Sequence, residues 1–216
     1  MKTRTDKVFF NMTTSLFEQI IVVVCGLITP RLILSTFGST YNGVISSATQ
    51  FLNVINVLTL GITASTRVAL YRPLADNDVL AVSSLVKATK KYMRKVAVCV
   101  IIYVFLLCIV YPIISKNDLT HFQNAVLIAI VGIGTFANYF FSISDMTLLQ
   151  AAQSTYIINI TNIIKSVVNT ICVIVLIRMH CSVYIVKLGS SIVFFVAPAM
   201  LSLYVKKRFK LISNCK

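Results

Sequence analysis

The chain has little charge, and what charge it has is mostly of one sign. Only 12% of its 216 residues are charged, whereas soluble domains carry roughly 25%. Acidic residues number 6 against 20 lysines and arginines, and 57% of the residues are hydrophobic. The mean hydropathy is +0.88. This composition excludes an ordinary soluble domain and predicts an all-α polytopic membrane protein.

Residues that usually carry catalysis or bind metals are also scarce. The two histidines, His121 and His180, are isolated, and the six cysteines lie mostly inside apolar runs without close pairs. Such cysteines are typical of packed cores rather than of metal or disulfide sites. The run Gly132-Ile-Gly134 follows no strand, so it favours close helix packing over nucleotide binding. No nucleophile–base pair or phosphate loop is recognisable, and we expect no metal, no cofactor and no enzymatic activity.

Apolar runs of span length divide the chain into one bundle of about six transmembrane helices, a single domain over residues 1–216. A span needs about 20 residues to cross a hydrocarbon core roughly 30 Å thick. The basic N-terminus precedes the first run without a small-residue cleavage site, so that run is expected to remain as an anchor. The predicted spans are 12–34, 42–68, 96–115, 122–149, 156–177 and 182–205.

The basic residues predict the orientation of the bundle. With six spans both termini share one side, and that side collects 15 of the 20 lysines and arginines, against three on the other side. The positive-inside rule therefore places both termini in the cytoplasm. The net charge of +14 is explained in this way, since no basic stripe with exposed aromatic residues indicates nucleic-acid binding.

The longest polar connection covers residues 69–95 on the predicted cytoplasmic side. Within it, apolar side chains of residues 78–92 fall on one side of a helix and lysines on the other. This pattern is typical of an amphipathic helix at an anionic lipid surface. A solvated loop before the third span explains the same residues equally well.

Polar residues inside the spans predict a water-filled cavity. The second span carries a stripe of them within about 140° of helical arc: Ser46, Thr49, Gln50, Asn53, Asn56, Thr63 and Arg67. One or two such groups commonly join neighbouring helices, and this stripe is longer than that role requires. In the fifth span, Lys165 lies near mid-membrane, where an unpaired lysine costs at least about 2.5 to 3.5 kcal/mol. We expect Lys165 to face water, an acidic partner or an anionic ligand.

Other polar residues of the spans extend the same hypothesis. Glu18 lies on a polar face of the first span, and Arg31 lies near its far end, where it either reaches the membrane surface or serves the cavity. Lys187 has the same two alternatives in the last span. The candidates that we predict to line the cavity are Lys165, Arg31, Glu18, Gln50, Asn53, Asn56, Asn138, Asp145, Asn162 and Asn169.

Four segments together resemble a known family. They are Thr29 to Leu52 (TPRLILSTFGSTYNGVISSATQFL), Arg67 to Ala75 (RVALYRPLA), Leu148 to Asn159 (LLQAAQSTYIIN) and Leu203 to Lys210 (LYVKKRFK). In their order along the chain they resemble the N-terminal half of the Wzx-type polysaccharide flippases, of the multidrug/oligosaccharidyl-lipid/polysaccharide exporter superfamily. The resemblance spans nearly the whole chain.

The resemblance implies a flippase in the bacterial cytoplasmic membrane. Its substrate would be an oligosaccharide linked to undecaprenyl pyrophosphate, moved to the outer leaflet for capsule or O-antigen (lipopolysaccharide) biosynthesis. Such transporters pair two bundles, and this chain matches only the first, so a truncated or half-size member would need a second bundle or a second copy. Relatives often carry an acid where Ala152 stands, so that role is not transferred.

Two other functions remain open from the sequence. One is an inert or accessory membrane fragment that pairs with other export components. The other is a small-molecule antiporter of the drug-export branch, in which Glu18 or Asp145 would be the proton-coupled carboxylate.

Overall fold

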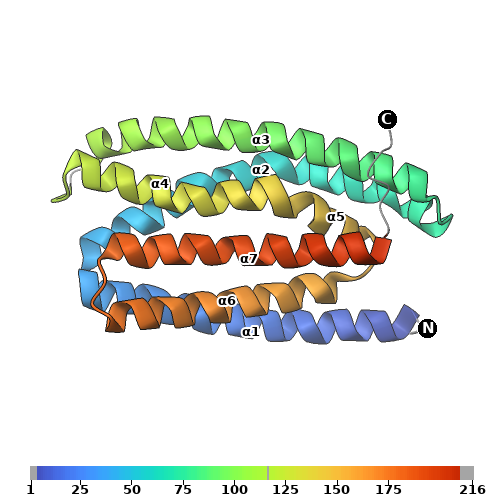
Figure 1. Ribbon diagram of the computed structural model, residues 1–216, viewed down its shortest axis with the longest axis horizontal. Coiled ribbons are helices and arrows are strands. Elements are labelled where there is room, and N and C mark those ends of the chain that lie inside the picture. Colours follow the sequence, from blue (N-terminus) through green and yellow to red (C-terminus); the bar gives the residue numbers. More distant parts are fainter. Residues whose placement is uncertain (1–3, 116, 210–216) are drawn as a thin grey trace.

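The computed structural model of the chain is a bundle of long helices (Figure 1). It describes residues 4–115 and 117–209. The helical elements are α1 (Arg4–Phe37), α2 (Ser39–Ala75), α3 (Val79–Ile114), α4 (His121–Ala137), the π-helix η1 (Asn138–Ser142), α5 (Ile143–Ala151), α6 (Thr155–Arg178) and α7 (Val183–Phe209). The expected all-α membrane fold is confirmed.

The described residues contain five to six helical segments that suit a membrane. Five spans are long and apolar enough, one of them formed jointly by α4, η1 and α5. Helix α2 is bent by 42° between its parts Ser39–Val57 and Thr59–Ala75, and it makes a sixth when both parts count as one span. The single-domain division of the sequence stays a prediction.

Short turns reverse the chain at each end of the bundle. Gly38, between α1 and α2, has φ of 92°, a conformation that favours glycine. Asn77, Gln153 and His180, which follow α2, α5 and α6, have φ of 55°, the left-handed conformation common just after a helix. At the start of α4, Thr120 and Gln123 form a capping box, which satisfies two exposed backbone N–H groups.

The helices alternate in direction, so α1 begins and α7 ends at the same end of the bundle (Figure 1). The turns α2–α3 and α5–α6 lie at this end too, as six passes require. The assignment of this end to the cytoplasm rests on the positive-inside rule and stays a prediction. Four of the basic residues counted for it, Lys2, Lys116, Lys210 and Lys216, lie outside the described residues.

The polar connection expected over residues 69–95 takes a different form in the structure. Helix α2 continues to Ala75, and α3 runs unbroken from Val79 through the third span. At 36 residues α3 is about 54 Å long, well beyond the roughly 30 Å hydrocarbon core. The apolar face of its first half is buried in the bundle, where Val82 and Val86 pack with Leu148 and Leu201. That face covers neighbouring helices rather than a lipid surface.

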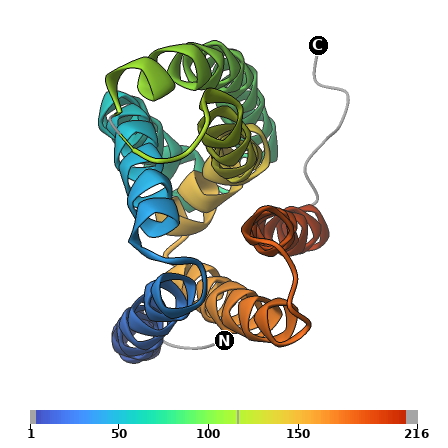
Figure 2. The same ribbon diagram turned by 90° about the vertical axis from the view of Figure 1, so that its left-hand side faces the viewer.

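The bundle has two groups of helices, seen from one end in Figure 2: α2, α3 and α4 in one, and α1, α6 and α7 in the other. Contacts between α4 and α7 join the groups along their length. Buried clusters close the bundle at both ends, around Leu148 near the termini and around Leu127 at the opposite end. Between these clusters, polar side chains of α2 face α6 and α7 across a hollow interior.

Candidate functional site: a cationic cavity within the bundle

Two adjoining hollows form what we call the central cavity. The α4-side hollow, about 320 Å³, lies among α2, α4, η1, α5, α6 and α7. The α1-side hollow, about 440 Å³, lies among α1, α2, α6 and α7. They share the lining residues Ile45, Thr49, Asn169, Lys187 and Phe194. The volumes lie within the range of about 300 to 1,000 Å³ typical of ligand sites.

The structure brings most of the predicted residues to this cavity. Seven of the ten candidates line one or both hollows: Lys165, Gln50, Asn53, Asn56, Asn138, Asn162 and Asn169. The polar stripe of α2 is therefore a wall of the cavity as far as Asn56. Beyond Asn56, the next residue of the stripe is Thr63, whose hydroxyl donates to the Thr59 and Leu60 carbonyls of α2 itself.

Lys165 is held by groups from two helices. Its Nζ donates to Asn162 Oδ1 at 3.3 Å and lies 5.3 Å from the centre of the Phe194 ring, within the range of a cation–π contact. Asn162 in turn donates through Nδ2 to Glu18 Oε1 at 2.7 Å. The Asn162 amide therefore joins the carboxylate of α1 to the ammonium group of α6.

Glu18 lies beside the cavity rather than in its lining. Besides Asn162, the Asn159 amide reaches its other oxygen at 2.8 Å in the orientation that best satisfies the neighbours of Asn159. Two amides of α6, one turn apart, thus hold the carboxylate against α1. Glu18 influences the cavity through Asn162 and by its charge.

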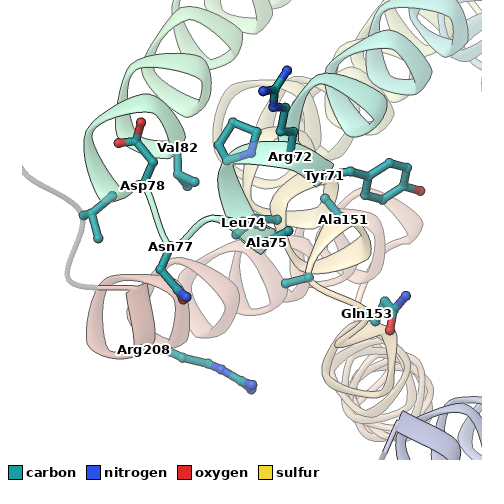
Figure 3. Close-up of a pocket in the computed structure, with 13 residues that line it drawn as sticks. Tyr71, Arg72, Leu74, Ala75, Asn77, Asp78, Val82, Ala151, Gln153 and Arg208 are labelled. Carbon is teal, nitrogen blue, oxygen red and sulfur yellow. The ribbon is translucent and has the colours of Figure 1, made fainter.

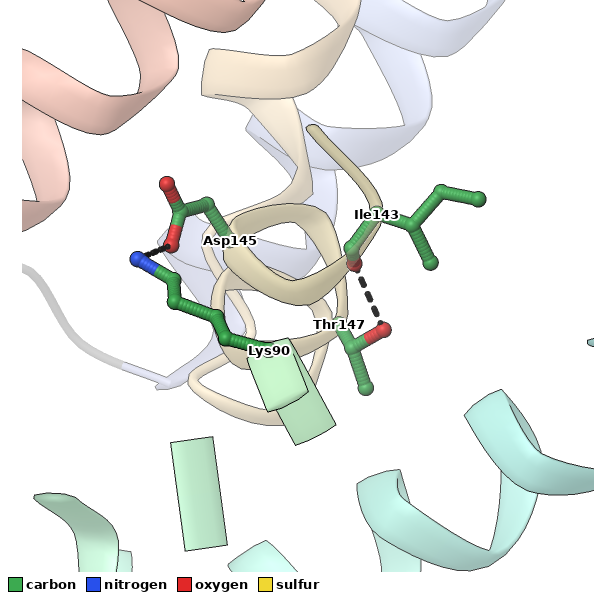
Figure 4. Close-up of polar contacts among 4 residues, drawn as sticks. All are labelled: Lys90, Ile143, Asp145 and Thr147. Atoms are coloured by element: carbon green, nitrogen blue, oxygen red, sulfur yellow. Dashed lines mark hydrogen bonds and ion pairs between the residues drawn. The ribbon is translucent and has the colours of Figure 1, made fainter. Parts of the chain in front are cut away.

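Asp145 and Arg31 lie away from the cavity. Asp145 is fully buried, and its Oδ1 lies 2.7 Å from Lys90 Nζ of α3 (Figure 4). The sequence placed Asp145 among the cavity candidates, but the long α3 continues past α5 and covers it. Arg31 is exposed on α1 and belongs to neither hollow.

Several lining residues were not among the candidates. They are Thr49, Thr135, Tyr139, Ser142, Lys187, Ser190 and Ser191. Lys187 could have been selected from the sequence, because it is a charged residue within an apolar span. Tyr139 is buried in the π-helix η1 and donates through its hydroxyl to Asn56 Oδ1 at 2.7 Å. A tyrosine in an apolar run is typical of membrane helices, so only the fold reveals this contact.

The charge of the cavity is positive. Its lining contains Lys165 and Lys187 and, over residues 4–115 and 117–209, no acidic side chain. The rest of the lining consists of amides, hydroxyls and apolar groups. Such a surface can pair with an anion through its ammonium groups and hydrogen-bond a hydroxyl-rich molecule through its amides.

A third hollow, of about 940 Å³ and separate from the central cavity, lies at the end of the bundle that holds both termini (Figure 3). It lies between the α2–α3 turn, the α5–α6 turn and α7, and Arg72, Asn77, Gln153 and Arg208 are among its lining residues. Although larger, it contains none of the predicted candidates, and Arg72 already pairs with Asp76 at 3.8 Å. The central cavity is therefore the better candidate site.

No protein-family model, curated protein or solved structure matches this chain. The structure itself shows a multi-pass α-helical membrane protein with a cationic, amide-lined cavity between its helices.

Proposed function

We propose that this protein is a flippase that moves lipid-linked oligosaccharides across the bacterial cytoplasmic membrane for capsule or O-antigen biosynthesis. The observation that supports the proposal is the central cavity, which combines two lysines with seven amide side chains and, among the residues that the structure describes, no carboxylate. The family resemblance of the sequence supplies the substrate class, an oligosaccharide on undecaprenyl pyrophosphate.

Each part of such a substrate has a matching environment. Sugar hydroxyls both donate and accept hydrogen bonds, as do the amides of Asn53, Asn138 and Asn162 in the cavity wall. A pyrophosphate group is anionic, and the Lys165 ammonium group can form charge-assisted hydrogen bonds with it. The lipid tail remains in the bilayer, where it needs no protein partner.

The antiporter alternative is less well supported. A carrier of organic cations is expected to expose a carboxylate to its substrate. Asp145 instead pairs with Lys90, and Glu18 is held by amides of α6 outside the lining. The two ammonium groups that do line the cavity would repel a cationic substrate.

A flippase of this kind also needs its polar surface covered on the open side. Gln50, Asn53 and Asn56 of α2 are exposed although they belong to a membrane-spanning segment, and exposed polar groups are costly in lipid. We propose that a second bundle or a second copy of the chain covers them in the transport unit.

The proposal is tested by complementation of a bacterial strain that lacks its own repeat-unit flippase. We expect the chain to restore surface polysaccharide and Lys165→Ala to reduce it by about tenfold or more, since a lost charge-assisted contact is worth about 1.5 to 3 kcal/mol. Lys91→Ala is the matched control, because Lys91 is exposed outside the cavity. Immunoblots of membranes verify equal protein levels.

Two results would count against the proposal. If the chain restores no polysaccharide, a flippase made of copies of this chain alone is refuted. If Lys165→Ala restores as much as the unaltered chain, Lys165 has no part in the mechanism.

A further inference from the structure

Three polar side chains gather where the two hollows of the central cavity meet. Lys187 and Asn169 line both hollows, and Ser190 lines the α4-side hollow. Lys187 and Ser190 are three residues apart on α7, so they share one helix face. Asn169 comes from α6, which packs against α7. We call these three residues the Lys187 cluster.

The Lys187 cluster has polar atoms that the protein leaves unpaired. Ser190 is buried, with 6% of its surface exposed, yet its Oγ has no hydrogen-bond partner in the described part of the chain. The same holds for the buried Oδ1 of Asn169. Buried polar atoms are nearly always paired, and an exception calls for an explanation such as a ligand or water.

The neighbouring Ser191 shows what a purely structural serine looks like here. It is buried to the same degree, but its Oγ donates to the Ile130 carbonyl at 2.7 Å and so joins α7 to α4. No such partner is present for Ser190 in the described part of the chain. Ser190 lines the α4-side hollow on the same face of α7 as Lys187, so we expect its unpaired hydroxyl to turn toward a molecule bound there.

The Lys187 cluster also lies at a different depth from Lys165. Measured from the α6–α7 turn, Lys165 is 13 residues before Arg178 and Lys187 is four residues after Val183. At 1.5 Å per residue their backbones are about 14 Å apart along the bundle. Lys187 therefore offers a second cationic position, nearer the end opposite the termini.

We propose that Lys187, Ser190 and Asn169 form a second binding site, for an oxyanion that carries a hydroxyl group. The Lys187 ammonium group pairs with the oxyanion, the Ser190 hydroxyl donates to it, and Asn169 Oδ1 accepts from the ligand hydroxyl. This inference rests on the proposed function, within which the oxyanion is either a carboxylate of an acidic sugar or a phosphate of the lipid carrier.

Titrations of the purified chain in phosphatidylcholine nanodiscs test the site, with glucuronate and inorganic pyrophosphate as separate probes. We expect Lys187→Gln to weaken binding about tenfold, and Ser190→Ala about three- to fivefold, because charged contacts contribute more than neutral ones. Lys187→Arg keeps the charge and should retain most of the affinity.

Thr161→Val is the matched control. It removes a buried hydroxyl that already donates to the Ile157 carbonyl and that lies outside the lining of both hollows, so it should leave affinity unchanged. Ser190→Ala should weaken binding. Asn169→Leu distinguishes the two sources, because it should weaken glucuronate and spare pyrophosphate, which has no sugar hydroxyl to donate.

The site is refuted if neither probe binds the unaltered chain, if Lys187→Gln leaves affinity unchanged, or if Ser190→Ala and Thr161→Val affect binding equally. These outcomes are separable from the complementation assay. Anion binding without restored polysaccharide keeps the site and refutes the flippase. Restored polysaccharide with unaltered binding in Lys187→Gln and Ser190→Ala keeps the flippase and refutes the site.

Discussion

We expect the two partners of the buried ion pair between Lys90 and Asp145 to cost different amounts of stability when each is replaced. Asp145 has 1% of its side chain exposed and Lys90 has 33%. Replacing Lys90 by methionine leaves a buried carboxylate without a countercharge. Replacing Asp145 by asparagine leaves an ammonium group that can still turn toward solvent. We therefore expect the lysine variant to be the more damaging of the two.

The geometry sets the size of the effect. At 2.7 Å between Nζ and Oδ1, Coulomb attraction at an effective dielectric constant of about 20 is roughly 6 kcal/mol. Desolvation of the two ions costs several kcal/mol each, so the intact pair contributes little net stability. Removing one partner of a buried pair typically costs about 3 to 5 kcal/mol, which we expect for Lys90→Met. For Asp145→Asn we expect about 1 to 2 kcal/mol, the cost of unsatisfied buried polar groups.

Reversible unfolding in mixed micelles, by titration with sodium dodecyl sulfate, measures these free energies. The double variant Lys90→Met/Asp145→Leu should be more stable than Lys90→Met alone, because it leaves no buried charge. Lys91→Met on the exposed side of α3 is the control, with an expected change within about 0.5 kcal/mol. Equal losses for the two single variants, or a double variant no better than Lys90→Met, would refute the reasoning.

Two further predictions concern helix contacts, and the same unfolding assay measures both. A Cβ at Gly132 would lie 2.7 Å from both methyl groups of Val104, a stiff side chain, whereas a Cβ at Gly134 would have its nearest atom 3.6 Å away. Gly132→Ala should therefore lower the free energy of unfolding by about 1 to 3 kcal/mol through overpacking. An equal loss in Gly134→Ala would contradict this prediction. Glu18→Leu should cost about 1 kcal/mol more than Glu18→Gln, because glutamine still accepts from Asn162, and indistinguishable variants would show that this hydrogen bond contributes nothing.

Much of the cavity could be predicted from helical periodicity. A helix places residues three and four apart on one face, so the polar residues of α2 from Thr49 to Asn56 had to lie on the same wall of any cavity. Asn162, Lys165 and Asn169 of α6 follow the same spacing. The high energetic cost of lysine at mid-membrane indicated that this second face avoids lipid. Placing the two faces opposite each other required the fold.

Periodicity could not identify the partners of single charged groups. Asn138 and Asp145, both predicted to line the cavity, are seven residues apart and would share a face in a regular α-helix. The π-helix between them adds a residue to one turn and changes that register. The other partner, Lys90, lies on a segment expected to be a separate connection, so its approach to Asp145 depended on the continuous α3.

Composition and the lengths of the apolar runs determined that this chain is an α-helical membrane protein, because backbone groups in lipid must pair within their own segment. The tertiary structure decided which polar faces meet, that Lys187 joins Lys165 at the cavity, and that Asp145 does not. These outcomes depend on the bend of α2, on the π-helix η1 and on close helix contacts such as that between Gly132 and Val104. Such features arise from contacts between residues far apart in the chain, which local sequence pattern does not encode.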